Sequence, residues 1–184
     1  EELPLPVFCR VIEAIAKYDG SAAWCVGQGS GCSMLGGYLD TAISGKIWGD
    51  NANGVLAWGP GKAEAKAVDG GYLVTAKTMF VSGSHHATWL ATHCSTVYEQ
   101  DGSVRMGKGD KPEIRTTFIR ANETTLSDKW YVFGLRNTGS DGFKLKEHFV
   151  PTEHTIVRAT MIEGADDLSP LYNFSIMAIY AMGF

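Results

Sequence analysis

The feature that most constrains the fold is a change in hydrophobic period along the chain. Between residues 4 and 46 apolar side chains recur at helical spacing, whereas from about Gly49 to Arg158 they alternate with polar ones. A period of 3.6 residues is typical of an amphipathic helix, and a period of two is typical of a strand with one buried face. The sequence therefore predicts helices followed by a block of short strands, an α+β organisation with segregated layers.

The N-terminal part is predicted to contain three helices. Asp19-Gly20 is a suitable stop for the first helix, and Ser21 is a suitable N-cap for the second. The second helix, from Ala22 to Gly37, is rich in small residues, and Gly45 is predicted to end a short third helix.

The strand block contains its clearest alternation in residues 72–82. Asp69-Gly70-Gly71, just before it, has the composition of a hairpin turn. Further strands are predicted over residues 88–95, 114–120 and 143–150, and Pro151 is predicted to end the last one. One face of the first strand is predicted to carry Tyr72, Val74, Ala76, Thr78, Phe80 and Ser82. One face of the last strand is predicted to carry Phe143, Leu145 and Phe149.

Composition limits the class of function. The chain is 45% hydrophobic and 20% charged, which is typical of a soluble packed protein. A net charge of -4 without a basic cluster gives nucleic-acid binding no electrostatic basis, and no apolar run reaches membrane-spanning length. The cysteines lack the spacing of a metal site or a disulfide framework, so we expect no metal and a cytoplasmic location. They are Cys9, Cys25, Cys32 and Cys94.

Two short motifs suggest chemistry that their context does not support. Residues 27–31, Gly-Gln-Gly-Ser-Gly, lack the preceding strand that a dinucleotide-binding loop requires, so we interpret them as a close helix contact. His85 and His86 are adjacent, and neighbouring side chains on a strand point to opposite faces, so they are not expected to bind one metal ion together.

Three segments together resemble a known family. The first is Asp69-Gly70-Gly71-Tyr72 leading into Phe80-Val81-Ser82-Gly83; the second is residues 130–140, of the form W-x-x-x-G-x-R-x-T-x-S; the third is His148-Phe149-Val150-Pro151. In this order and spacing they resemble the acyl-CoA dehydrogenase superfamily. Its dehydrogenases usually carry Thr-Glu-Pro and then Gly-Ser-Asp where this chain has Ala57-Trp58-Gly59-Pro60. The departure favours the branch of flavin-dependent monooxygenases.

The resemblance implies a fold and a domain organisation. Residues 1–48 would end an N-terminal helical domain, 49–158 would form a middle antiparallel β-barrel that binds flavin, and 159–184 would form a linker and the start of a C-terminal helical bundle. Residues 170–184 are apolar on nearly all sides, like a buried helix whose neighbours this sequence does not supply. We therefore expect a truncated bundle, catalytic residues that lie in its missing part, and no activity from these residues alone.

The resemblance also implies an activity. It is that of the oxygenase component of a two-component monooxygenase, which takes reduced FMN or FAD from a separate flavin reductase and uses oxygen to oxidise a small organic substrate. A homo-oligomer, dimer or tetramer, is implied as well. The expected flavin contacts are Trp58, Phe80, Val81, Ser82, Trp130 and Ser140, and the expected substrate contacts are Asn51, Asn53 and His85.

The sequence leaves alternatives open. From the pattern alone, Phe80 and Trp130 are as well explained as core residues, and Ser140 and the two asparagines as parts of polar turns. An FAD-dependent acyl-CoA dehydrogenase remains an alternative activity. A non-catalytic domain for ligand binding or assembly is a third.

Overall fold

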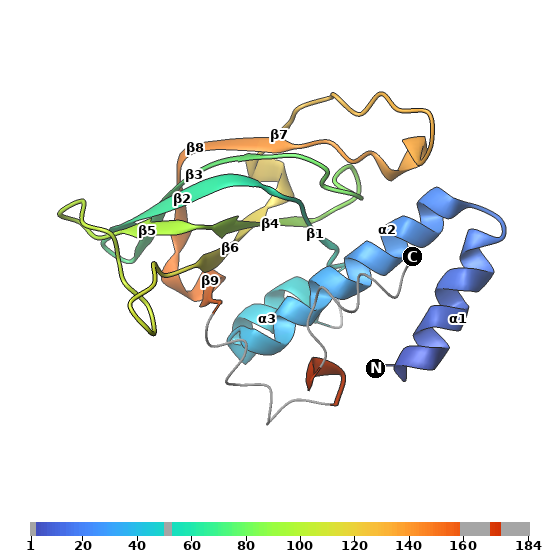
Figure 1. Ribbon diagram of the computed structural model, residues 1–184, viewed down its shortest axis with the longest axis horizontal. Helices are drawn as coiled ribbons and strands as arrows, with labels where there is room; N and C mark the ends of the chain where they lie inside the picture. The colour runs from blue at the N-terminus through green and yellow to red at the C-terminus, as the bar shows by residue number, and fades with distance from the viewer. Residues whose placement is uncertain (1–2, 50–52, 159–169, 174–184) are drawn as a thin grey trace.

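The computed structural model describes residues 3–49, 53–158 and 170–173, which form a helical part and a strand-rich part (Figure 1). The helices are α1 Leu5–Ala16, α2 Gly20–Ser33 and α3 Thr41–Trp48, with short 3-10 turns η1 Met34–Tyr38, η2 Ala121–Glu123, η3 Arg136–Thr138, η4 Thr152–His154 and η6 Pro170–Asn173. The strands are β1 Leu56–Trp58, β2 Gly61–Val68, β3 Gly71–Thr78, β4 Trp89–Cys94, β5 Thr96–Tyr98, β6 Arg115–Arg120, β7 Thr125–Leu126, β8 Phe143–Pro151 and β9 Thr155–Val157.

The three predicted N-terminal helices are confirmed, but two of their boundaries were wrong. Asp19, rather than Ser21, caps α2, because its carboxylate accepts a hydrogen bond of 2.8 Å from the Ala22 amide. Gly45 lies inside α3, which continues to Trp48 and ends at Gly49. Residues 27–31 lie within α2, as interpreted from the sequence.

The strands form two sheets rather than the antiparallel barrel that the resemblance implied. One sheet has the order β1-β4-β6-β9 and the other the order β5-β2-β3-β8-β7. Within the described residues no pairing closes either sheet, and the β1–β4 and β2–β5 pairs are parallel. The prediction of a strand-rich middle region is confirmed, but its strands form two open, mixed sheets.

The hairpin of β2 and β3 confirms the predicted turn. Val68 pairs with Gly71, so Asp69 and Gly70 form the two-residue connection, and Gly70 has a positive φ of 76°, which glycine adopts without steric penalty. The predicted alternation holds along β3 as far as Thr78, where the strand ends.

The predicted face of β8 was partly wrong because of a β-bulge. Val74 pairs with His148 and Ala76 with Leu145, so β8 carries one more residue than β3 in this interval. Glu147 takes a left-handed φ of 48° there, and the extra residue reverses the two faces. Phe149 is consequently 49% exposed, while Val150 is buried.

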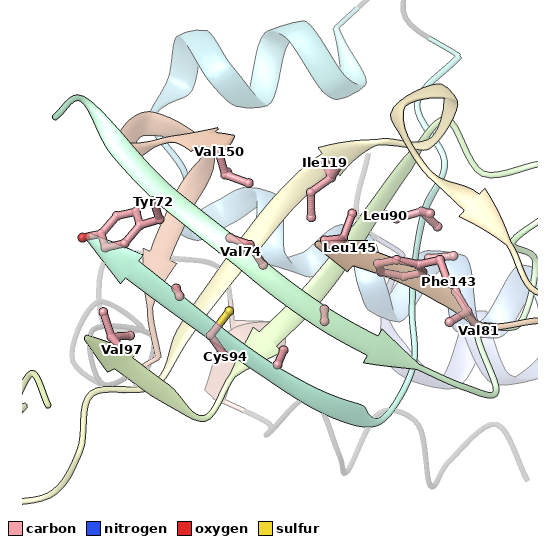
Figure 2. Packing of buried hydrophobic residues seen from close by; sticks show 14 of the residues in the cluster. Tyr72, Val74, Val81, Leu90, Cys94, Val97, Ile119, Phe143, Leu145 and Val150 are labelled. Carbon is pink, nitrogen blue, oxygen red and sulfur yellow. The ribbon is translucent and has the colours of Figure 1, made fainter. Parts of the chain in front are cut away.

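The chain is layered around two hydrophobic clusters. The first cluster lies between the two sheets (Figure 2). The second lies between the four-stranded sheet and the helices α2, η1 and α3. Strand β4 serves both, because Leu90 and Cys94 enter the first cluster whereas Trp89 and Ala91 enter the second. Both faces of the four-stranded sheet are therefore covered.

Some predictions concern residues that the structure does not describe. Asn51 lies outside the described residues, and so do residues 159–169 and 174–184, which include most of the predicted linker and bundle. Just before the last of these ranges, Tyr172 packs edge-on against Tyr38 with ring centroids 5.5 Å apart. None of the helices in the described ranges is long and apolar enough to cross a membrane.

The buried cluster between the sheets predicts a contrast between two phenylalanines. We expect Phe143→Ala to lower the free energy of unfolding by about 3–5 kcal/mol, because it leaves a cavity in a packed core. Phe133→Ala, a matched change at a fully exposed ring, is expected to alter it by about 0.5 kcal/mol or less. Urea unfolding followed by tryptophan fluorescence measures both, and similar losses would contradict the assigned core.

Candidate functional site

The candidate site forms where three segments meet at one end of the strand region (Figure 1). These are the loop 79–86 after β3, the connection 127–142 between β7 and β8, and the first turns of α2. The loop 99–112 lies at the opposite end. The site therefore joins the helical part of the chain to one end of the β3–β8 strand pair, where β3 ends and β8 begins.

The loop 79–86 begins with a sharp turn at Phe80. The Met79 amide still bonds to the Pro60 carbonyl at 2.9 Å, but Phe80 takes a left-handed φ of 54°. The turn buries Val81 in the cluster between the sheets and leaves the Phe80 side chain 56% exposed. The prediction that a strand continues to Ser82, with Phe80 and Ser82 on one face, was therefore wrong.

Left-handed residues concentrate at this site. Of the five non-glycine residues with positive φ in the described ranges, Phe80, Asp128 and Leu135 belong to its two loops. Such a conformation costs an estimated 1–3 kcal/mol each and persists only where surrounding contacts hold it. Two glycines allow neighbouring backbone segments to approach closely at these loops. A Cβ atom on Gly59 would lie 2.2 Å from the Met79 carbonyl oxygen, and a Cβ atom on Gly142 would lie 2.0 Å from the Thr78 carbonyl oxygen.

Hydrogen-bonded hydroxyls link the three segments. The Trp24 indole on α2 donates to Ser82 Oγ at 2.8 Å, and Ser82 Oγ lies 2.9 Å from Ser140 Oγ. Ser140 Oγ lies 2.6 Å from Thr138 Oγ1, which donates to the Leu135 carbonyl at 2.8 Å. We call Ser82, Ser140 and Thr138 the hydroxyl relay. Ser82 is half-buried, whereas the other two hydroxyls are buried.

A buried carboxylate fixes the loops to each other. Asp141 is 4% exposed; its Oδ1 accepts from the amides of Lys129 and Trp130, and its Oδ2 lies 2.8 Å from His85 Nε2. Burial by itself raises the pKa of Asp141, but the hydrogen bonds from Lys129, His85 and Trp130 outweigh it and hold this pKa below its usual value. The main chain of Asp141 also accepts from the Val81 amide at 3.1 Å.

An aromatic pair stands beside these polar groups. Phe80 and Trp130 meet edge to face with centroids 5.9 Å apart, and the Trp130 indole donates to the Leu135 carbonyl at 3.0 Å. Phe80 is exposed, and so are Met79, Tyr131 and Leu135 in the same two segments. The site thus combines an apolar, aromatic surface with a hydroxyl at its side.

The structure brings together most of the predicted flavin contacts. Phe80, Ser82, Trp130 and Ser140 all lie in the site, and so does His85, whose exposed ring bonds to Asp141. Val81 is also in the loop, and its fully buried side chain anchors the loop in the cluster between the sheets.

Trp58 and Asn53 take no part in the hydrogen bonds and ring contact described above. The Trp58 ring packs on His93, 4.5 Å between centroids, and belongs to the cluster between sheet and helices. Burial, with the nearby charge of Arg158, lowers the pKa of His93 to about 4, so this ring is neutral at pH 7. The Asn53 side chain is exposed and makes no hydrogen bond within the described residues.

Sequence reasoning missed three residues of the site. Trp24 lies in the helix that was interpreted only as small-residue packing, and Thr138 and Asp141 lie in a segment that also reads as an ordinary turn. The signal for the last two was their place near Ser140, because Thr138 belongs to the second motif and Asp141 directly follows it. No pattern in the sequence indicates that Trp24 meets Ser82, 58 positions away.

A separate cavity of about 600 Å³ lies among α1, the end of α2, α3 and Tyr172. Its lining contains no acid, base or cysteine among the described residues, and apolar side chains dominate it. No group of three or more histidine, cysteine, aspartate or glutamate side chains in the described ranges is arranged to bind a metal. Of this cavity and the Ser82 site, only the Ser82 site therefore carries acid and base side chains among the described residues.

The amino-acid sequence of this chain is similar to that of a known protein. No model of a known protein family matches the chain. A "Pigment production hydroxylase" of Rhodococcus erythropolis is 27% identical over 159 residues, which cover 85% of this chain and 39% of that protein. The chain thus spans well under half the length of this relative.

Two solved structures resemble nearly all of the chain. One is XiaF from Streptomyces sp. in complex with FADH2 and glycerol, with a TM-score of 0.85, 23% identity, and coverage of 98% of this chain and 45% of that one. The other is the HsaA monooxygenase from M. tuberculosis, with a TM-score of 0.78, 24% identity, and coverage of 94% and 45%. The chain shares their fold. It is the acyl-CoA dehydrogenase-like fold that the three motifs implied.

The buried carboxylate predicts a pH-dependent stability. The folded-state pKa of Asp141 lies below that of the unfolded chain, so its contribution is fully present above about pH 4 and is lost as pH falls through the lowered value. We expect Asp141→Asn to lower the free energy of unfolding at pH 7 by about 2 kcal/mol, because hydrogen bonds to a buried charge are removed. The variant should also lose less stability than the parent on acidification.

Denaturant titrations at pH 7 and below pH 4 measure this difference. Asp110→Asn, in the exposed loop 99–112, is the matched control and should behave like the parent. Equal acid sensitivity in the parent and in Asp141→Asn would show that the carboxylate does not hold the loops together.

Proposed function

We propose that this chain is the flavin-binding part of the oxygenase component of a two-component monooxygenase, which oxidises a small organic substrate. The observation that carries the proposal is that an exposed Phe80 on a strained turn pairs with a half-buried Trp130 beside the Ser82 and Ser140 hydroxyls. It is supported by the relative named as a hydroxylase and by the FADH2 complex of XiaF. By analogy, reduced FMN or FAD would come from a separate flavin reductase, and the protein would be a homo-oligomer.

The residues at the site fit a flavin. The isoalloxazine ring is a flat apolar plate with a polar edge, so it needs an apolar wall and a few aimed polar groups. Phe80 and Met79 are large apolar side chains left half exposed beside the half-buried Ser82. Two adjacent large apolar side chains are seldom left exposed on a strained turn. Their exposure suits a surface that a bound isoalloxazine ring would cover. When bound, reduced flavin supplies the electrons that activate oxygen.

The residues of the chain would have distinct tasks. Phe80 and Trp130 would provide the wall, and Ser82 would offer a hydroxyl to the edge of the ring. Asp141 would hold the connection 127–142 in shape through the amides of Lys129 and Trp130. It would join this connection to the loop 79–86 through His85 and the Val81 amide. His85, the exposed partner of Asp141, is the side chain of this group best placed to meet a substrate.

Part of the site would come from elsewhere. We propose the domain boundaries given above, at residues 48 and 158, and a C-terminal helical bundle that supplies the opposite wall and the catalytic residues. The exposure of Phe80, Tyr131 and Phe133 accords with such a cover. A dry pocket would result, which protects oxygen chemistry from water.

Flavin binding by the complete protein tests the proposal. In anaerobic titrations, dithionite-reduced FMN or FAD is expected to bind, and added oxygen with a suitable substrate is expected to give an oxygenated product. Ser82→Ala should weaken binding of the reduced flavin by about fivefold, because a neutral hydrogen bond contributes about 1 kcal/mol. Ser103→Ala, in the loop at the opposite end of the strand region, is the control and should change nothing.

The alternatives predict different results in the same experiment. Tightly bound FAD with turnover of an acyl-CoA and no oxygenated product would identify a dehydrogenase. Failure to bind flavin in either redox state would indicate a non-catalytic domain and would refute the proposal.

A further inference from the structure

The direction of the hydrogen bonds in the hydroxyl relay is determined by its two ends. An indole N–H can only donate, so Ser82 Oγ accepts from Trp24. A carbonyl oxygen can only accept, so the Thr138 hydroxyl donates to Leu135. Each serine or threonine hydroxyl has one hydrogen to donate and two lone pairs to accept with.

These rules assign the middle of the relay. Because Thr138 has given its hydrogen to Leu135, the 2.6 Å contact requires Ser140 to donate to Thr138. Because Ser140 has then given its hydrogen, the 2.9 Å contact requires Ser82 to donate to Ser140. Ser82 therefore has no hydrogen left for a ligand. With one lone pair occupied by Trp24, it retains a single place to accept a hydrogen bond.

This arrangement discriminates between the redox states of a flavin. The N5 atom of the ring carries a hydrogen in the reduced form and can donate it. In the oxidised form N5 has only a lone pair and needs a donor. We propose that Thr138, acting through Ser140, holds Ser82 as a hydrogen-bond acceptor and thereby makes this site favour reduced over oxidised flavin. The inference rests on the proposed function.

Thr138 would act as a positioning residue without touching the flavin. It is 2% exposed, and Ser140 stands between it and Ser82. Reversing the relay in the parent protein would break the bond from Thr138 to Leu135, a bond of 2.8 Å in a buried setting. The loss of this buried hydrogen bond opposes binding of the oxidised ring.

Thr138→Val removes the end of the relay and keeps the shape of the side chain. Ser140 is then free to donate to Ser82, and Ser82 is free to donate to oxidised N5. We expect the ratio of the dissociation constants, oxidised over reduced, to fall about fivefold relative to the parent. For a two-electron couple this is a decrease of about 20 mV in the midpoint potential of the bound flavin. Thr138→Ser keeps the hydroxyl and is expected to leave the ratio unchanged.

The experiment is a pair of anaerobic flavin titrations, reduced and oxidised, on the complete protein and both variants, with the potential measured by equilibration with a reference dye. A purely structural role of Thr138 would weaken both redox forms in parallel, and an unchanged ratio in Thr138→Val would overturn the inference. Should Thr138→Val fail to fold, Ser140→Ala breaks the relay at its next member and must lower the same ratio. If the parent binds flavin in neither state, the proposed function itself fails and this inference with it.

Discussion

The left-handed turn at Phe80 is the constraint on which the site depends. It ends β3, sends Val81 into the core and leaves Phe80 exposed at the surface. A positive φ at a bulky residue costs an estimated 1–3 kcal/mol, which is similar to the gain of about 1.5–3 kcal/mol from burying a valine. Hydrogen bonds on both sides stabilise the turn: the Met79 amide donates to the Pro60 carbonyl, and the Val81 amide donates to the Asp141 carbonyl. Without the turn, Phe80 would continue the buried face of β3 and no aromatic wall would exist.

The polar groups of the site follow from the same geometry. The turn places Ser82 where α2 and the connection 127–142 both reach it, so one hydroxyl joins the Trp24 indole to Ser140. Asp141 stabilises the arrangement because its carboxylate and its main chain bond to different segments. A surface that is apolar on one side and directionally hydrogen-bonded on the other is suited to a planar ligand with a polar edge.

The sequence predicted the type and order of the main elements well, because each has a local signal. Asp69 and Gly70 mark a hairpin turn, and the alternation along β3 marks its buried face. It failed where long-range packing overrides the local pattern. The bulge at Glu147 reverses the faces of β8, and nothing in the alternation of that segment indicates an extra residue. The turn at Phe80 also has no signal in the sequence, because an apolar residue at that position continues the period of two.

Family resemblance, rather than pattern, indicated which side chains lie together in the candidate site. Phe80, Ser82, Trp130 and Ser140 lie together, whereas Trp58 packs on His93 in a different cluster. Trp24 could not be found because a contact between a helix and a loop 58 positions away has no sequence signature.

The central claim is that a flavin lies on the Phe80–Trp130 surface with its edge at Ser82. A crystal structure of the complete protein with reduced flavin tests it most directly. The account predicts the ring in contact with Phe80, with N5 within hydrogen-bond distance of Ser82 Oγ. A structure in which other side chains of the protein fill this surface, with the flavin bound elsewhere or absent, would contradict it.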